Sequence, residues 1–301
     1  MPRTVWADLS QETRSAVEDA CGPIRSAADS TDGVSCDLAS ALQLASGETV
    51  FCKGVRTDRG PLLRMQRTEA ALNPHLTDIA PRLLRQIHTA DWHFLVFEYV
   101  KGRPTDLGVG STDLERVADT LTILYEQLTP APVARTLPLA ERWSAAPGWA
   151  ALTDVHRPKL SRWAAANLPT LLAWEHRAPG LVSGDTLAHT DLSSSNFHLT
   201  ADGRILVLDW AWPASAAPWV DTAFTALRLI GAGHHPADAE YWAASVPVWS
   251  KATPDAVTAF AVAVAGVRAL RCATHPAPHL PGLASAAERW VRQRLEAPRL
   301  R

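Results

Sequence analysis

A short apolar run that ends in a carboxylate constrains this chain more than any other feature. Residues 206–208 read Leu-Val-Leu, and the turn-forming triplet Asp-Gly-Arg at 202–204 precedes them. This pattern predicts a buried strand entered from a hairpin, which places Asp209 at the end of the strand. A charged carboxylate beside a buried strand costs several kcal/mol unless a cation, a metal or a dense hydrogen-bond shell compensates it.

Two further oxygen donors precede the hairpin. Asp191 and Asn196 lie five positions apart on a polar loop, and they could share one cation with Asp209. Hard oxygen ligands of this kind suit Mg²⁺, which keeps several waters and completes its shell with substrate phosphates. The pattern therefore favours a magnesium site that also binds a phosphate compound.

Three segments, in order along the chain, resemble the motifs of one enzyme family. Residues 189–196 read His-Thr-Asp-Leu-Ser-Ser-Ser-Asn, the form His-x-Asp-x-x-x-x-Asn of the catalytic loop in protein-kinase-like phosphotransferases. Residues 209–210, Asp-Trp, and 218–223, Pro-Trp-Val-Asp-Thr-Ala, resemble two motifs of the aminoglycoside phosphotransferase and choline kinase group. Turn formation or helix capping would explain each aspartate singly, but not the order and spacing of all three motifs.

The resemblance implies an α+β, two-lobed protein-kinase-like fold, with a small antiparallel β N-terminal lobe and a mostly helical C-terminal lobe. We expect a nucleotide-binding lobe at 1–100 and, at 101–301, a lobe with the catalytic loop and the substrate-binding helices. The hydrophobic pattern agrees with this division. It predicts strands at 24–29, 37–44, 49–55, 82–87 and 94–99, helices at 8–20, 113–128, 221–230, 236–245, 254–272 and 284–295, and helical pieces between 130 and 180.

Phosphoryl transfer needs in-line positioning and neutralisation of charge rather than covalent chemistry from the protein. The resemblance makes Asp191 the catalytic residue that orients the acceptor hydroxyl and accepts its proton. Asn196 and Asp209 would hold Mg²⁺ across the phosphates of ATP or GTP. Lys53 would contact the α- and β-phosphates and be held by Glu69, although a lysine at the end of an apolar strand otherwise extends to the surface.

Other positions complete the nucleotide site that the resemblance implies. Gly33 and Ser35 follow the first strand, where a kinase fold covers the phosphates, although an ordinary hairpin loop would explain them equally well. Backbone atoms of Glu98 and Val100 would hold the adenine edge at the hinge between the lobes. Structural support of the catalytic loop is assigned to His189 and Asp221.

Composition restricts the partners. The chain has 301 residues and is 47% hydrophobic, which is enough for a full core. A net charge of -2 provides no basic surface, so we expect no nucleic-acid partner. The N-terminus carries no apolar signal core, and the longest apolar stretch, at 256–266, is too short to span a bilayer. We therefore expect a cytoplasmic protein without a membrane partner.

The expected activity is an ATP- or GTP-dependent O-phosphotransferase acting on a hydroxyl of a small molecule. A protein kinase is less well supported, because no Ala-Pro-Glu segment follows Asp209. After Trp210 there are nine arginine and lysine residues against six acidic ones, which does not suit a polycationic acceptor. We expect an antibiotic-inactivating kinase whose acceptor is a nucleoside-type or other non-aminoglycoside antibiotic. The alternatives are an aminoglycoside kinase, a kinase for a metabolite such as a sugar or a choline-like alcohol, or an inactive nucleotide-binding module.

Overall fold

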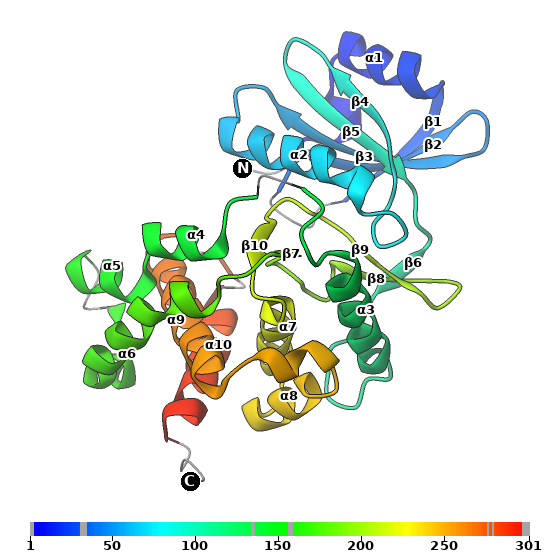
Figure 1. Cartoon of the computed structure of the whole chain (residues 1–301). Helices are drawn as coiled ribbons and strands as arrows, with labels where there is room; N and C mark the ends of the chain where they lie inside the picture. Colours follow the sequence, from blue (N-terminus) through cyan, green and yellow to red (C-terminus); the bar gives the residue numbers. More distant parts are fainter. Residues whose placement is uncertain are drawn as a thin grey trace. The chain divides into compact units, whose positions relative to one another are not determined.

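The computed structural model describes residues 3–30, 35–133, 136–155, 159–275, 277–278 and 280–296. The chain forms two compact units (Figure 1). The first unit comprises Met1–Pro104 and Ser195–Trp212, and the second comprises Thr105–Ser194 and Pro213–Arg301. The 195–212 segment, which the expected division placed in the C-terminal lobe, thus belongs to the first unit.

The first unit is built on a five-stranded antiparallel sheet in the order β1-β2-β3-β5-β4. The five predicted strands are confirmed, with boundaries that differ by at most two residues. The predicted helix at 8–20 begins later, at 11, because the Ser10 hydroxyl caps it by accepting from the Thr13 amide at 3.1 Å. The elements are η1 (Trp6–Asp8), α1 (Gln11–Cys21), β1 (Ile24–Asp29), β2 (Leu38–Leu44), β3 (Thr49–Arg56), α2 (Gly60–Leu72), η2 (Asn73–His75), β4 (Leu83–His88) and β5 (Trp92–Glu98).

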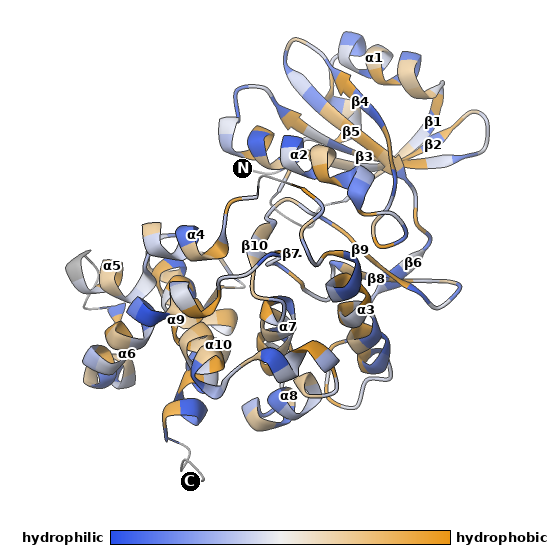
Figure 2. Cartoon of the chain, in the orientation of Figure 1, coloured by the Kyte–Doolittle hydropathy of each residue, from blue (hydrophilic) through white to orange (hydrophobic). Residues whose placement is uncertain are grey.

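Helices cover both faces of this sheet, α1 on one face and α2 on the other (Figure 1). Because side chains alternate along a strand, Val50 and Cys52 of β3 pack in the same cluster as Val17 of α1. Val55 packs with Leu63 of α2 on the opposite face. Strand β5 is therefore buried along almost its whole length, and the apolar colouring runs along these central strands (Figure 2).

A smaller antiparallel sheet completes the first unit, in the order β6-β8-β9. Its strands are β6 (Gly102–Pro104), β8 (Phe197–Thr200) and β9 (Ile205–Val207). The predicted hairpin is confirmed, and Gly203 adopts a positive φ of 87° in its turn. The strand ends at Val207, whose amide donates to the Ile79 carbonyl at 2.7 Å, so Asp209 lies two residues beyond the strand.

The second unit is mostly helical, as expected (Figure 1). The helices predicted after residue 100 are confirmed, again with small shifts at their ends. Helix α6 remains continuous for 20 residues although Pro169 and Pro179 lie inside it. The elements are α3 (Asp113–Gln127), α4 (Leu139–Ala145), α5 (Gly148–Val155), α6 (Arg162–Leu181), β7 (Thr186–Ala188), β10 (Ala214–Ala216), α7 (Val220–Gly231), α8 (Pro236–Ala243), η4 (Pro247–Lys251), α9 (Pro254–Thr274) and α10 (Leu280–Glu296).

Helix α9 is the central helix of the second unit and packs against α5, α6 and α10. It extends beyond the apolar stretch at 256–266 to 21 residues, so its length and composition alone would allow it to cross a membrane. However, 67% of its most apolar 18-residue window is buried inside the protein. Rings from four other elements or loops surround Phe260 at its centre, as in the core of a globular protein.

Candidate functional site

Lys53 of β3 lies between two carboxylates of the first unit. It projects from the sheet face that α2 covers, and its Nζ donates to Glu69 Oε1 at 2.7 Å. The same Nζ lies 3.1 Å from Asp209 Oδ1, after β9. Lys53 therefore forms an ion pair with Glu69 and with Asp209, and the nucleotide-binding roles of Lys53 and Glu69 stay predictions. Burial alone would lower the pKa of Lys53, but Asp209 and Glu69 together raise it above its ordinary value, so the amine stays charged.

A buried polar chain fixes the strand that carries Lys53. Gln66 of α2 donates from Nε2 to the Lys53 carbonyl at 3.1 Å. His93 Nδ1 lies 2.7 Å from Gln66 Oε1, and because that oxygen only accepts, His93 must donate. Burial, with His88 and Arg67 nearby, lowers the pKa of His93 to about 4, so the ring is neutral. Sequence reasoning missed this chain because its members lie on three different elements.

Asp209 adopts a left-handed backbone conformation with φ of 64°, which is uncommon outside glycine and costs energy. Its Oδ2 accepts from the Ser35 hydroxyl at 3.0 Å. The Leu208 amide donates to the Asn196 carbonyl at 2.8 Å, so Asn196 and Asp209 flank the open end of one hairpin. A strained conformation of this kind persists only where surrounding contacts maintain it, and such residues cluster at functional sites.

The donor set at this hairpin fits a hard divalent cation. Asp209 supplies a carboxylate and Asn196 an amide oxygen, which are the oxygen donors that Mg²⁺ binds. Within the described parts of the chain, no three His, Cys, Asp or Glu side chains group closely enough to hold a metal by themselves. A metal here would thus take most of its remaining ligands from water and nucleotide phosphates, as Mg²⁺ does in kinases.

The remaining nucleotide-binding candidates have varied surroundings. Gly33 lies outside the described residues, and Ser35 contacts Asp209 as described above. The Glu98 amide donates to the Arg82 carbonyl at 3.0 Å. The Val100 carbonyl is 3.2 Å from His198 Nε2, which must be the donor in this contact.

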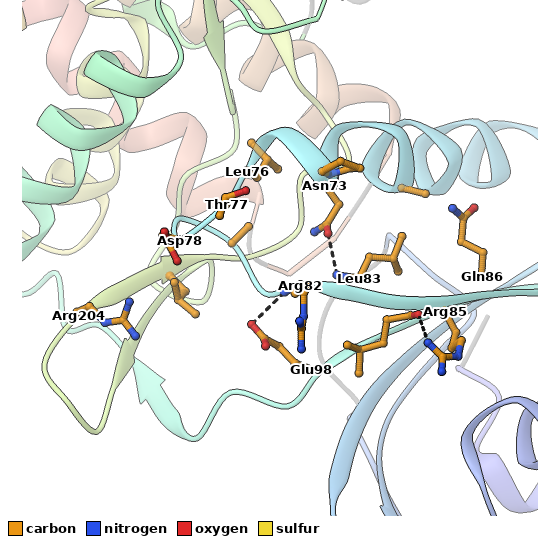
Figure 3. Close-up of a pocket in the computed structure, with 15 residues that line it drawn as sticks. Asn73, Leu76, Thr77, Asp78, Arg82, Leu83, Arg85, Gln86, Glu98 and Arg204 are labelled. Atoms are coloured by element: carbon orange, nitrogen blue, oxygen red, sulfur yellow. Dashed lines mark hydrogen bonds between the residues drawn. The ribbon is translucent and has the colours of Figure 1, made fainter.

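A groove of about 750 Å³ opens along β4 on the first unit (Figure 3). Its walls come from β4, from the segment after α2 and from the β8–β9 hairpin, where Arg204 lies. Among the predicted site residues that the structure describes, only Glu98 lines this groove. Its carboxylate accepts from the Arg82 amide at 3.0 Å. Lys53 and Glu69 instead line a much smaller cavity of about 40 Å³ together with Trp210. The large volume of the first groove therefore gives no reason to place the phosphate site in it.

The loop that carries Asp191 belongs to the second unit, and a buried carboxylate holds it. Asp221 accepts from the His189 amide at 2.7 Å and from the Thr190 amide at 2.9 Å. Thr190 has a positive φ of 63°. His189 is fully buried, and its Nδ1 accepts from the Asp191 amide at 3.2 Å. Burial raises the pKa of Asp221, and His189 and the two amides oppose that rise. This geometry agrees with the supporting roles expected for His189 and Asp221.

Sequence reasoning missed the arginine that binds Asp191. Arg228 of α7 donates from Nη2 to Asp191 Oδ1 at 2.7 Å and from Nε to the Leu192 carbonyl at 3.2 Å. Arg142 contacts the same loop at the Thr190 hydroxyl, at 3.2 Å. Arg228 follows Asp221 by seven positions, two turns of one helix, so both face the same direction. This seven-residue spacing could therefore have indicated Arg228 from the sequence.

Taken together, these features define an α+β fold of the protein-kinase-like type. Sequence comparison finds no matching family model and no matching curated protein. Comparison with solved structures finds many of similar fold.

Three of these structures illustrate the likeness. Choline kinase LicA from Streptococcus pneumoniae has a TM-score of 0.64 at 12% identity, and the alignment covers 94% of this chain and all of that one. An aminoglycoside phosphotransferase from Alicyclobacillus acidocaldarius has a TM-score of 0.60 at 16% identity, covering 94% and 95%. Amicoumacin kinase hAmiN, in complex with AMP-PNP, Ca²⁺ and Ami, has a TM-score of 0.60 at 13% identity, covering 97% and 95%. The fold expected from the motifs is confirmed.

Proposed function

We propose that this protein transfers the γ-phosphoryl group of ATP or GTP to a hydroxyl of a small molecule. The observation that carries the proposal is the contact of Lys53 with both Glu69 and Asp209, at 2.7 Å and 3.1 Å. In protein kinases the strand lysine, the helix glutamate and the metal-binding aspartate must all be in place for transfer. The neighbours of similar fold, which include small-molecule kinases, support the same chemistry.

The proposed roles divide between the two units. In the first unit, Lys53 would bind the α- and β-phosphates, and Asp209 and Asn196 would hold Mg²⁺, which supplies positive charge to neutralise the phosphates when it is bound. Ser35 and Gly33 contribute to the loop over the phosphates. Glu98 and Val100 hold the base through backbone atoms.

In the second unit, Asp191 orients the acceptor hydroxyl and takes its proton, on a loop that His189 and Asp221 support. The acceptor oxygen forms a bond to the γ-phosphorus. The bond from that phosphorus to its bridging oxygen breaks, and the nucleoside diphosphate leaves with the electron pair. The proton of the hydroxyl passes to Asp191, so atoms and charge balance.

The acceptor we favour is a nucleoside-type or other non-aminoglycoside antibiotic, which would make the protein a resistance kinase of the cytoplasm. An aminoglycoside or a metabolite such as a sugar or choline-like alcohol is the second candidate, since the similar structures include an aminoglycoside phosphotransferase and a choline kinase. An inactive nucleotide-binding module is disfavoured, because every polar position that the chemistry needs is filled.

A coupled assay of nucleoside diphosphate release tests the proposal. The purified protein is incubated with Mg²⁺ and ATP or GTP against aminoglycosides, peptide and nucleoside antibiotics, sugars and amino alcohols. We expect turnover with at least one hydroxyl acceptor, and its loss in Lys53→Ala. Nucleotide binding without turnover of any acceptor would support the inactive module instead.

A further inference from the structure

Positive charge gathers around Asp191 in the second unit. Arg228 of α7 is bonded to Asp191, and Arg268 of α9 lies close enough for the charges of both to act on it. Arg271 follows Arg268 by three positions on α9, so it projects from the same side of the helix. The charge of Arg271 also acts on Arg268 and on Arg142. The charges of Arg228, Arg268 and Asp191 therefore act on one another.

Arg268 is the most buried arginine among the described residues. Its relative exposure is 9%, and its Nε has no hydrogen-bond partner in the described part of the chain. Burial and the nearby Arg228 lower the pKa of Arg268 to about 10, which still leaves it charged at neutral pH. A buried cation with an unused donor is costly, and such a donor is matched most readily by a carboxylate or phosphate.

The nearby carboxylates are already engaged by other donors. Asp191 Oδ1 accepts from Arg228 at 2.7 Å. Both oxygens of Asp221 accept from the amides of the loop, at 2.7 Å and 2.9 Å. The second unit thus holds a buried guanidinium, electrostatically coupled to its proposed catalytic aspartate, with a donor that suits an anion from outside the chain.

We propose that the acceptor carries an anionic oxygen group, a carboxylate or a phosphate, and that Arg268 binds it while Asp191 orients the hydroxyl. The inference rests on the proposed function and names the class of its substrate. The planar guanidinium matches either group in a bidentate geometry. A polycationic acceptor would be repelled by the same cluster, so aminoglycosides are disfavoured, and among the non-aminoglycoside acceptors those that carry a carboxylate or phosphate are favoured.

The first experiment measures anion binding without turnover. Inorganic phosphate is titrated into the wild-type protein by calorimetry, with the nucleotide site saturated by Mg²⁺ and a non-hydrolysable ATP analogue. We expect binding that weakens roughly 10- to 100-fold in Arg268→Gln and recovers in part in Arg268→Lys, which restores the charge but not the fork. Arg162→Gln, at an exposed position of α6, is the matched control and should bind as the wild type does.

The second experiment compares acceptors that differ only in charge. Hydroxy acids and sugar phosphates are assayed beside the amides of the same acids, the unphosphorylated sugars and amino alcohols. We expect turnover to be concentrated on the anions, and Arg268→Gln to raise the KM for the anionic acceptor roughly 10- to 100-fold while the KM for nucleotide stays unchanged.

The outcomes separate this inference from the function on which it rests. Turnover confined to neutral or cationic acceptors would overturn the inference and leave the phosphotransferase standing. Phosphate binding abolished by the ATP analogue, or a raised nucleotide KM in Arg268→Gln, would assign the arginine to the γ-phosphate and would also overturn it. Phosphate binding that needs Arg268, without turnover of any acceptor, would support the anion site and contradict the proposed function.

Discussion

At the scale of single residues, the two aspartates of the proposed chemistry have different surroundings. Asp191 is paired with Arg228, on a loop whose backbone amides are held by a buried carboxylate. Asp209 is strained, with φ of 64°, and contacts Lys53 and Ser35. We expect their substitutions to damage different steps of the reaction.

Replacing Asp191 with asparagine should abolish transfer without preventing nucleotide binding. The change removes the group that takes the acceptor proton but leaves Lys53 and Asp209 intact. We expect kcat to fall on the order of 10²-fold or more. Single-turnover kinetics and a nucleotide titration of the same preparation check this, and near wild-type turnover would remove Asp191 from the mechanism.

Asp209→Asn should weaken productive binding of the Mg²⁺–nucleotide complex. The amide oxygen keeps the shape of the side chain but carries no charge to oppose the divalent ion. We expect the concentration of Mg²⁺ that gives half-maximal activity to rise, with a smaller effect at saturating Mg²⁺. An unchanged metal requirement in a Mg²⁺ titration would place the metal elsewhere.

At the scale of elements, the contact between α5 and α9 depends on two glycines. A Cβ on Gly148 would overlap the backbone of Gly266 and Val267, and a Cβ on Gly266 would lie 2.7 Å from Trp149 Cδ1. Trp149 Nε1 donates to the Val262 carbonyl at 2.8 Å, and Glu175 of α6 accepts from the Trp149 amide at 2.8 Å. Close backbone approach and buried polar contacts thus fix this crossing.

Gly148→Ala should therefore destabilise the second unit. The methyl group has no space, and overpacking of this kind costs about 1–3 kcal/mol or more. Gly180→Ala on α6 is a matched control, because nothing lies within 4 Å of the added carbon; it should leave stability unchanged or raise it by up to about 1 kcal/mol. Urea unfolding of both variants measures the difference. Equal midpoints would contradict the claim that the α5–α9 contact requires a glycine at position 148.

Strand β5 carries a pH-dependent contribution to stability through His93. The side chain is 1% exposed, and burial, His88 and Arg67 lower its pKa to about 4. An unfolded chain, with an ordinary histidine pKa near 6.5, binds more protons between pH 6.5 and pH 4. This contribution is therefore fully present above about pH 6.5 and is lost as the pH falls toward 4.

We expect acidification through that range to cost about 3 kcal/mol at His93, from about 1.36 kcal/mol for each pKa unit. His93→Gln keeps an amide donor near Gln66 but cannot titrate, so its unfolding free energy should fall less over the same range. Urea unfolding at pH 7 and pH 4.5 gives the comparison. Identical pH dependence in the two proteins would show that His93 does not titrate as described.

At the scale of the whole molecule, the chain crosses between its two units three times, at 104/105, 194/195 and 212/213. The proposed phosphate-binding and metal-binding residues belong to the first unit, whereas Asp191 and the arginines belong to the second. We therefore expect the Mg²⁺–nucleotide complex to bind residues of the first unit and the acceptor to bind residues of the second.

Mg²⁺ with nucleotide should raise the unfolding temperature of the whole protein. A ligand that binds only the native state at 100 times its Kd stabilises it by about 2.7 kcal/mol, which corresponds to a rise of roughly 5 °C for a chain of this size. Lys53→Ala should lose most of this shift. Scanning calorimetry with and without nucleotide provides the measurement, and an equal shift in the variant would separate Lys53 from nucleotide binding.

The sequence alone predicted the fold class, the five strands and most helices, because their periodicities and turn residues are local. The ordered spacing of three motifs also predicted Asp191, Asn196, Asp209 and Asp221 as site residues, and the family resemblance added Lys53 and Glu69. The roles of these residues stay predictions.

Only the tertiary structure assigned the 195–212 segment to the first unit, joined Gln66 to His93, and bonded Arg228 to Asp191. Total charge after Trp210 indicated an excess of arginine but not where that excess lies. Long-range packing decides which charges meet, so whether a buried arginine is paired with an anion depends on residues that are distant in the sequence. No local pattern along the chain contains that information.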